Sequence, residues 1–182
     1  MQAEVGPMIP GARKINLSSL LLIFALFLLP GPSLAGQYQV YRVVNGDTFI
    51  VKHGSVKLTI RLFGIDAPEM SNRRHQVGQP FSLEAEQHLS KLILGKTVEV
   101  KSYGVDRNGR TLGEVFLLNG RNVNLEMLQA GLAEVYREKL AAGPDMHPYW
   151  QAEEEAREAK RGMWVQGEGY VSPGDWRIKH QS

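Results

Sequence analysis

The stretch "RLFGIDAPE", residues 61–69, places one arginine and two carboxylates at the end of an apolar run that is typical of a buried strand. Pro68 favours a turn here, because a proline biases the residue before it away from helix. Arg61 and Asp66 are five residues apart and would face opposite sides of a flat strand. Their side chains can meet only if the chain bends between them, and Gly64 and Pro68 permit such a bend.

The residues before this stretch predict a meander of three short strands. "YQVYRVV" at 38–44 and "TFIVK" at 48–52 are rich in β-branched and aromatic residues, and they flank Asn45-Gly46, a strong signal for a hairpin. "HGS" at 53–55 then turns the chain into a third strand, "VKLTIRLFGI". Consecutive strands joined by tight turns are expected to pair as neighbours.

In the residues after "RLFGIDAPE", the spacing of the apolar residues changes from that of a strand to that of a helix. "PFSLEAEQHLSKLILG" from Pro80 predicts a helix over 82–94, since its apolar residues recur at helical spacing and a glycine follows. Strand character returns in "KTVEVKSY" and "TLGEVFLL" around the turn "DRNGR" at 106–110. Two further helices are expected near 123–130 and 148–160. This α+β order allows a small closed barrel, although the pattern alone does not establish closure.

The N-terminus predicts a secretory signal. Arg13 and Lys14 precede the apolar run "LLLIFALFLL" at 20–29, and Ser33 and Ala35 have the spacing of a cleavage site. An uncleaved anchor is the rival interpretation, but the run is about half the ~20 residues that a membrane span needs. We expect cleavage after Ala35, export to the periplasm or the medium, and no stable membrane association afterwards.

Composition limits what the rest of the chain can be. Residues 36–182 amount to 147 residues, which suits a single domain. The chain has no cysteine, so an exported form would carry no disulfide scaffold. Its net charge is +2, and the leader holds two of the bases and one of the acids, so the remainder is +1. This balance excludes a surface that coats nucleic acid but permits a local basic cleft.

Four motifs together resemble one family. "NGDT" at 45–48, "RLFGIDAPE", "DRNGR" and "QAGLAEVY" at 129–136 occur in the order and approximate spacing of the staphylococcal nuclease (thermonuclease) family, and the ends "AKRGMW" and "GDWR" are similar to its secreted bacterial members. Each motif alone is weak, but four in order are specific. The resemblance implies a five-stranded oligonucleotide-binding (OB) barrel with about three helices. It also implies a Ca²⁺-dependent phosphodiesterase that cuts DNA and RNA.

The resemblance assigns five site residues. Asp47 and Asp66 fall on the calcium carboxylates, and hard oxygen ligands are what calcium requires. Glu69 falls on the carboxylate that acts as general base or orients the attacking water. Arg61 and Arg110 fall on the two arginines that hold the phosphate, for which a planar guanidinium fork is well suited. Taken alone, Asp47 would be a turn residue and either arginine a surface ion-pair partner.

Substrate contacts are predicted from fewer signals. Tyr136 is the nearest aromatic candidate for stacking, because Asn108 stands where the family has a tyrosine. Arg73 and Arg74 could meet backbone phosphates, although a merely solubilising loop is an equal alternative. The family also commonly has aspartate where this chain has Asn45.

The leading hypothesis is therefore an exported, monomeric, calcium-dependent nuclease acting on DNA and/or RNA. The main alternative is a non-catalytic module that uses the same barrel to bind nucleic acid. An exported structural domain is the third, and it leaves the coincidence of five site residues unexplained. In the tail "PGDWRIKH", Trp176 is expected to pin the chain's end to the core rather than to stack on a base.

Overall fold

The predicted meander forms the first three strands of a closed barrel. The computed structural model describes residues 35–71, 77–138 and 143–180, and all structural statements concern these residues. Strands β1 (Ala35–Asn45), β2 (Thr48–His53) and β3 (Val56–Leu62) pair antiparallel in sequence order. The turn after Asn45 is the predicted hairpin, in which Asn45 pairs with Thr48.

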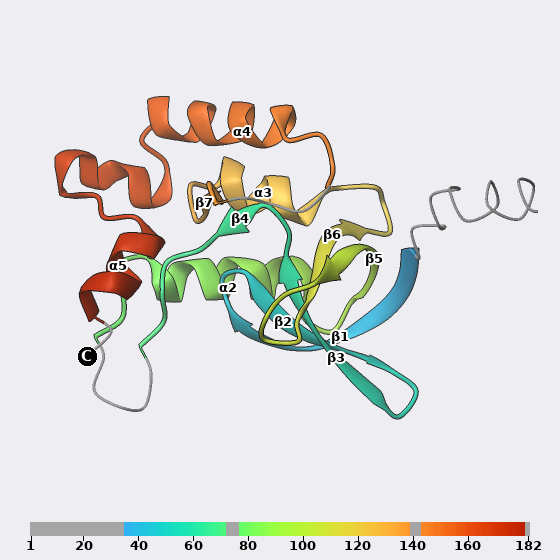
Figure 1. The fold of residues 1–182 in the computed structure, drawn as a ribbon. Coiled ribbons are helices and arrows are strands. Elements are labelled where there is room, and N and C mark those ends of the chain that lie inside the picture. Colours follow the sequence, from blue (N-terminus) through green and yellow to red (C-terminus); the bar gives the residue numbers. More distant parts are fainter. Residues whose placement is uncertain (1–34, 72–76, 139–142, 181–182) are drawn as a thin grey trace, which may run out of the picture. The chain divides into compact units, whose positions relative to one another are not determined.

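Two later strands close the barrel (Figure 1). Strands β5 (Thr97–Val105) and β6 (Thr111–Leu117) form the second predicted hairpin, and the barrel order is β1-β2-β3-β6-β5. Closure comes from β1 pairing with β5 and from β3 pairing with β6 in parallel. The prediction of a five-stranded OB-type barrel in an α+β protein is confirmed.

The three predicted helices form within two residues of their expected bounds. They are α2 (Ser82–Ile93), α3 (Val123–Gln129) and α4 (His147–Glu158). Two more follow in the described residues, the 3-10 helix η1 (Gly162–Gly169) and α5 (Pro173–His180). No helix in the described part of the chain is long and apolar enough to cross a membrane.

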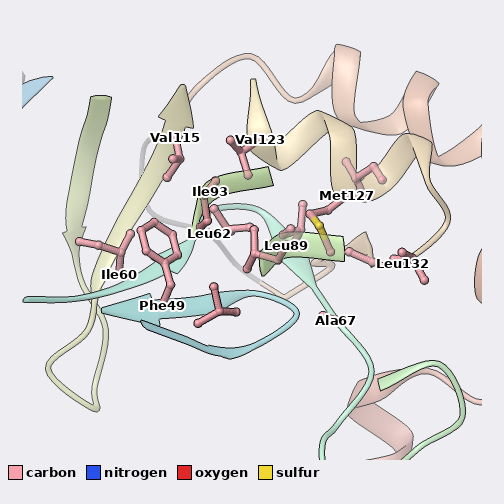
Figure 2. Close-up of a cluster of buried hydrophobic side chains, with 14 of the residues drawn as sticks. Phe49, Ile60, Leu62, Ala67, Leu89, Ile93, Val115, Val123, Met127 and Leu132 are labelled. Carbon is pink, nitrogen blue, oxygen red and sulfur yellow. The ribbon is translucent and has the colours of Figure 1, made fainter. Parts of the chain in front are cut away.

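The hydrophobic core lies between the barrel and helices α2 and α3. Figure 2 shows barrel side chains such as Phe49 and Ile60 beside Leu89 and Ile93 of α2 and Met127 of α3, all at most 1% exposed. The hairpin turn between β1 and β2 meets α2 closely. A Cβ on Gly46 would come within 2.6 Å of the Ala85 Cβ, so only glycine fits there.

The chain turns sharply after β3 and does not continue as the single strand that the sequence predicted. Gly64 has φ +73°, a conformation that favours glycine, and the two-residue strand β4 (Ile65–Asp66) then pairs with β7 (Glu134–Val135). The buried Asn124 of α3 stabilises this turn by donating to the carbonyls of Phe63 (2.9 Å) and Gly113 (3.2 Å). The bend required for Arg61 and Asp66 to meet is therefore present.

Candidate active site

Hydrogen bonds from neighbouring residues hold Asp47 at the β1–β2 turn. Asp47 is 2% exposed, and its carboxylate accepts hydrogen bonds from the Thr48 hydroxyl (2.7 Å) and from the Ala67 N–H (3.3 Å). Its own N–H donates to the Asn45 side chain at 3.2 Å. Asn45 thus supports the turn, which agrees with the strong turn preference of an Asn-Gly pair.

Arg61 joins the two predicted calcium carboxylates. It lies on β3 opposite Thr48, next to Asp47. Its Nη1 is 3.1 Å from Asp47 Oδ2, and its Nη2 is 2.7 Å from Asp66 Oδ1. These two contacts use two of the five N–H donors of a guanidinium, so the group retains donors for a phosphate.

The charge of Arg61 is stabilised where it lies. Burial lowers the pKa of this guanidinium, but the carboxylates of Asp47 and Asp66 outweigh burial and the pKa is raised overall. The two aspartates are each 2% exposed, and removing them from water without a counter-charge would be costly. Arg61 provides that counter-charge for both.

Glu69 lies on the chain just after Asp66 with its side chain 31% exposed. Its backbone is fixed by Gln79, whose side-chain oxygen accepts the Glu69 N–H (3.0 Å) and whose N–H donates to the Glu69 carbonyl (2.8 Å). The Gln79 amide also donates to the carbonyl of Val171 at 2.7 Å. Gln79 is 4% exposed and therefore connects the Glu69 segment with the C-terminal segment inside the protein.

Arg110 comes from the β5–β6 turn. Asp106 accepts the Arg110 Nε–H at 2.7 Å and, through its other oxygen, the backbone N–H of Asn108 and of Arg110 at 2.9 Å. These bonds hold the pKa of Asp106 below its usual value, although burial opposes the shift. The Nη1 group of Arg110 lies 3.5 Å from the Thr48 hydroxyl. The turn therefore presents Arg110 beside the hairpin that holds Asp47.

Arg177 on helix α5 reaches the carboxylates of Asp66 and Glu69. Arg177 Nη2 is 2.7 Å from Asp66 Oδ2, and its Nη1 is 2.6 Å from Glu69 Oε1 and 3.1 Å from Asp66 Oδ1. Burial lowers the pKa of Arg177, but bonding to Asp66 and Glu69 outweighs burial and the pKa is raised. The sequence placed Arg177 only in the tail motif "GDWR" and assigned it no role at the site.

One cleft brings four of the predicted residues together with Arg177, and the buried Asp47 and Asp66 are not part of its lining. Its lining includes the side chains or backbone of Arg61, Glu69, Arg110, Tyr136 and Arg177. Tyr136 is fixed by its N–H to the Gly64 carbonyl (2.9 Å) and by its hydroxyl to Glu138 (2.7 Å). It therefore lies within reach of a substrate that occupies this cleft. Arg73 and Arg74 lie outside the described residues.

The tail is attached differently from the prediction. Trp176 stacks on His180 within α5, with 4.1 Å between ring centroids, and does not belong to either buried core cluster of the described residues. The ion pairs of Arg177 and the bond from Gln79 to Val171 attach the tail instead.

The donor set is compatible with a hard divalent cation. Asp47 and Asp66 offer carboxylate oxygens, which are the ligands that calcium prefers, at opposite ends of one guanidinium. Within the described ranges, no group of three or more His, Cys, Asp or Glu side chains could hold a metal. A cation at this place would therefore need water, backbone or substrate oxygens to complete its coordination.

Comparisons with known proteins agree with this geometry. The sequence profile described as "Staphylococcal nuclease homologue" matches residues 59–166. An "Uncharacterized endonuclease" of Escherichia coli O157:H7 is 38% identical over 154 residues, covering 84% of this chain and 93% of that protein. An "Uncharacterized endonuclease" of Haemophilus influenzae is 34% identical over 166 residues, covering 91% of this chain and 85% of that protein. A "Probable endonuclease LCL3" of Komagataella phaffii is 37% identical over 159 residues, covering 85% and 68%. The barrel, the cleft and these matches together show that the chain belongs to the staphylococcal nuclease family.

Proposed function

We propose that this protein is an exported nuclease that hydrolyses phosphodiester bonds of DNA and/or RNA with one bound calcium ion. The enzyme class, a nuclease, follows from family membership. The observation that carries the finer proposal is the position of Arg61, whose guanidinium pairs with the two buried carboxylates of Asp47 and Asp66 and lines a cleft that Glu69 and Arg110 also line.

Each side chain has a role that its chemistry fits. Arg61 and Arg110 would donate hydrogen bonds to the non-bridging phosphate oxygens, on which negative charge grows as water attacks phosphorus. Glu69 would accept a hydrogen bond or the proton from that water. The bond from phosphorus to the leaving oxygen breaks opposite the attacking water, and the leaving oxygen then takes up a proton. The bonds from Gln79 to the Glu69 backbone would hold the carboxylate in position for this step.

Asp47 and Asp66 would hold the cation. A bound calcium ion would supply positive charge beside the phosphate and lower the pKa of nearby water. Calcium fits better than magnesium, because two carboxylates completed by water form a loose oxygen site, whereas magnesium demands near-ideal octahedral geometry. The alternative of a purely binding module would give no use to the pairing of Arg61 with both carboxylates.

The test is cleavage of end-labelled single-stranded DNA by metal-stripped protein, with calcium, with magnesium and with chelator. We expect cleavage with calcium, slow cleavage with magnesium and none in chelator. Arg110→Gln should reduce the rate by about 10²-fold or more, as for the loss of other preorganised donors to a developing anion. Arg121→Gln is the matched control, because Arg121 pairs with Glu126 and does not line the cleft that holds Arg61, Glu69 and Arg110.

Two results would count against the proposal. Full activity in chelator would remove the calcium assignment but leave the nuclease. Unchanged rates in Arg110→Gln, with Arg121→Gln also unchanged, would remove the proposed role of the arginines.

Export after cleavage behind Ala35, a monomeric state and phosphate contacts from Arg73 and Arg74 are also part of the proposal. The leader and both arginines lie outside the described residues. Export is checked by the intact mass of protein recovered from the periplasm or medium, which should begin at Gly36. A mass that includes residues 20–29 would contradict it. Sedimentation at micromolar concentration checks the monomer.

A further inference from the structure

Arg177 already occupies the carboxylate oxygens that a cation would need. Asp66 Oδ1 accepts from Arg61 and Arg177, and Asp66 Oδ2 accepts from Arg177. Arg177 also holds Glu69 Oε1 at 2.6 Å. Both oxygens of Asp66 and one oxygen of Glu69 are thus engaged by guanidinium groups.

A calcium ion would compete with these contacts for the oxygens of Asp66. It would need a carboxylate oxygen at about 2.3 to 2.6 Å, where the oxygens of Asp66 face N–H groups at 2.7 to 3.1 Å. It would also lie close to two positive guanidinium groups, whose charges repel it. This repulsion favours a movement of one arginine away from Asp66 when the site is loaded.

The structure makes Arg177 the arginine that moves. Arg61 lies on a barrel strand, its side chain is 15% exposed, and it also pairs with Asp47. Arg177 lies on the eight-residue helix α5, its side chain is 30% exposed, and Pro173 is the one buried residue of that helix. Short terminal segments with few buried residues open at low cost.

The segment before α5 would remain in place when the helix moves. Gln79 holds the Val171 carbonyl at 2.7 Å, and Gln79 is itself buried and bonded to the Glu69 backbone. The chain between Val171 and Pro173 can therefore serve as a hinge. A tethered group that leaves and returns acts at a high local concentration.

We infer that Arg177 is an additional functional residue of this site, an intramolecular cation that competes with calcium for Asp66 and Glu69 and so sets the calcium concentration at which the enzyme loads. This inference rests on the calcium dependence proposed above. Arg177 then has one position in the metal-free protein, on the carboxylates, and leaves them when calcium binds.

Calcium binding to metal-stripped protein, measured by titration calorimetry at fixed ionic strength, tests the inference without reference to activity. The protein is purified after expression of the full chain, and circular dichroism checks that each variant is folded. Arg177→Gln should bind calcium about tenfold more tightly than the wild type, which corresponds to about 1.4 kcal/mol. Lys179→Gln removes the same charge from an exposed position on the same helix, and its affinity should stay within about twofold. Asp66→Asn should abolish binding, which identifies the site.

Hydrogen exchange separates displacement from simple charge neutralisation. Calcium should speed amide exchange across α5 in the wild type, because the helix loses its ion pairs, and should leave α2 unchanged. Slower or unchanged exchange in α5 would overturn the inference, as would equal or weaker calcium binding by Arg177→Gln when the wild type binds. If neither protein binds calcium, the calcium part of the proposed function fails, and this inference fails with it.

Discussion

Replacing Arg61 with glutamine should lower both the stability of the protein and its cleavage rate. Replacing Arg110 should lower the cleavage rate with little effect on stability. Arg61 lies between two aspartates that are each 2% exposed. Arg110 pairs with Asp106 on a turn, where the two side chains are 24% and 15% exposed. The two arginines have the same proposed task on the phosphate, so the difference in stability isolates the structural role of Arg61.

The expected size of the effect follows from what each aspartate retains. Breaking a buried ion pair by removing one partner costs roughly 3 to 5 kcal/mol. Asp66 would keep Arg177, and Asp47 would keep the Thr48 hydroxyl and the Ala67 N–H. The low end applies, about 3 kcal/mol, which corresponds to a fall in Tm of roughly 6 to 12 °C for a domain of this size. The Arg110 pair is more exposed and is worth about 0.5 kcal/mol.

Thermal unfolding followed by circular dichroism in chelator measures this difference, with Arg121→Gln as control. DNA cleavage by the same proteins should fall by about 10²-fold or more for Arg61→Gln and Arg110→Gln. Calcium should narrow the stability gap of Arg61→Gln, because a bound cation replaces the lost charge. Equal melting temperatures for Arg61→Gln and wild type in chelator would refute the reasoning that Arg61 balances both aspartates.

Three further changes should give distinct results. Asn45→Asp should lower the half-saturating calcium concentration by a few fold at fixed ionic strength, since it adds a charge two residues from Asp47; an unchanged midpoint would show that position 45 supports only the turn. His88→Gln should reduce the loss of stability between pH 7 and 5.5. Burial lowers the pKa of His88 below 6.5, so the stability that the neutral imidazole contributes is complete above pH 6.5 and is lost as the pH falls below that value. Melting temperatures across this range check that, and parallel curves would contradict it. Gly46→Ala should destabilise by about 1 to 3 kcal/mol in urea unfolding, because its Cβ would meet another Cβ at 2.6 Å, while Gly169→Ala, which meets nothing within 4 Å, should not; equal midpoints for the two variants would count against it.

Local signals predicted most of the barrel, and the reason is visible in the structure. Each hairpin was identified by its turn residues, α2 by apolar spacing that faces the core, and α3 and α4 by the turn, proline and glycine residues at their ends. Closure was not predictable from these signals, because β3 and β6 pair in parallel across about fifty residues of sequence. The split of the third strand at Gly64 was permitted by the sequence but was required only by the meeting of Arg61 with Asp66.

The candidate site likewise contains residues that could be predicted from the sequence and one that could not. Asp47, Arg61, Asp66 and Glu69 lie within 23 residues of sequence on a hairpin and the strand that follows it. Their motif could therefore be identified from the sequence, and the resemblance supplied their roles. Arg177 is 111 residues from Asp66, in the tail motif "GDWR", to which the sequence assigned no role at the site. Only the folded chain places it on the carboxylates.

The charges at this site explain why a contact from so far along the chain belongs to it. Asp47, Asp66 and Glu69 would repel one another if they stood together without counter-charge. Arg61 pairs with the first two from within the barrel, whereas Glu69 pairs with Arg177. A cation balances all three in the working enzyme as proposed, so the metal-free protein needs a substitute at the Glu69 side. Arg177 reaches that side from α5 and joins Glu69 to Asp66. The C-terminal helix thus adds one positive charge to a group of three carboxylates that Arg61 alone leaves two positive charges short.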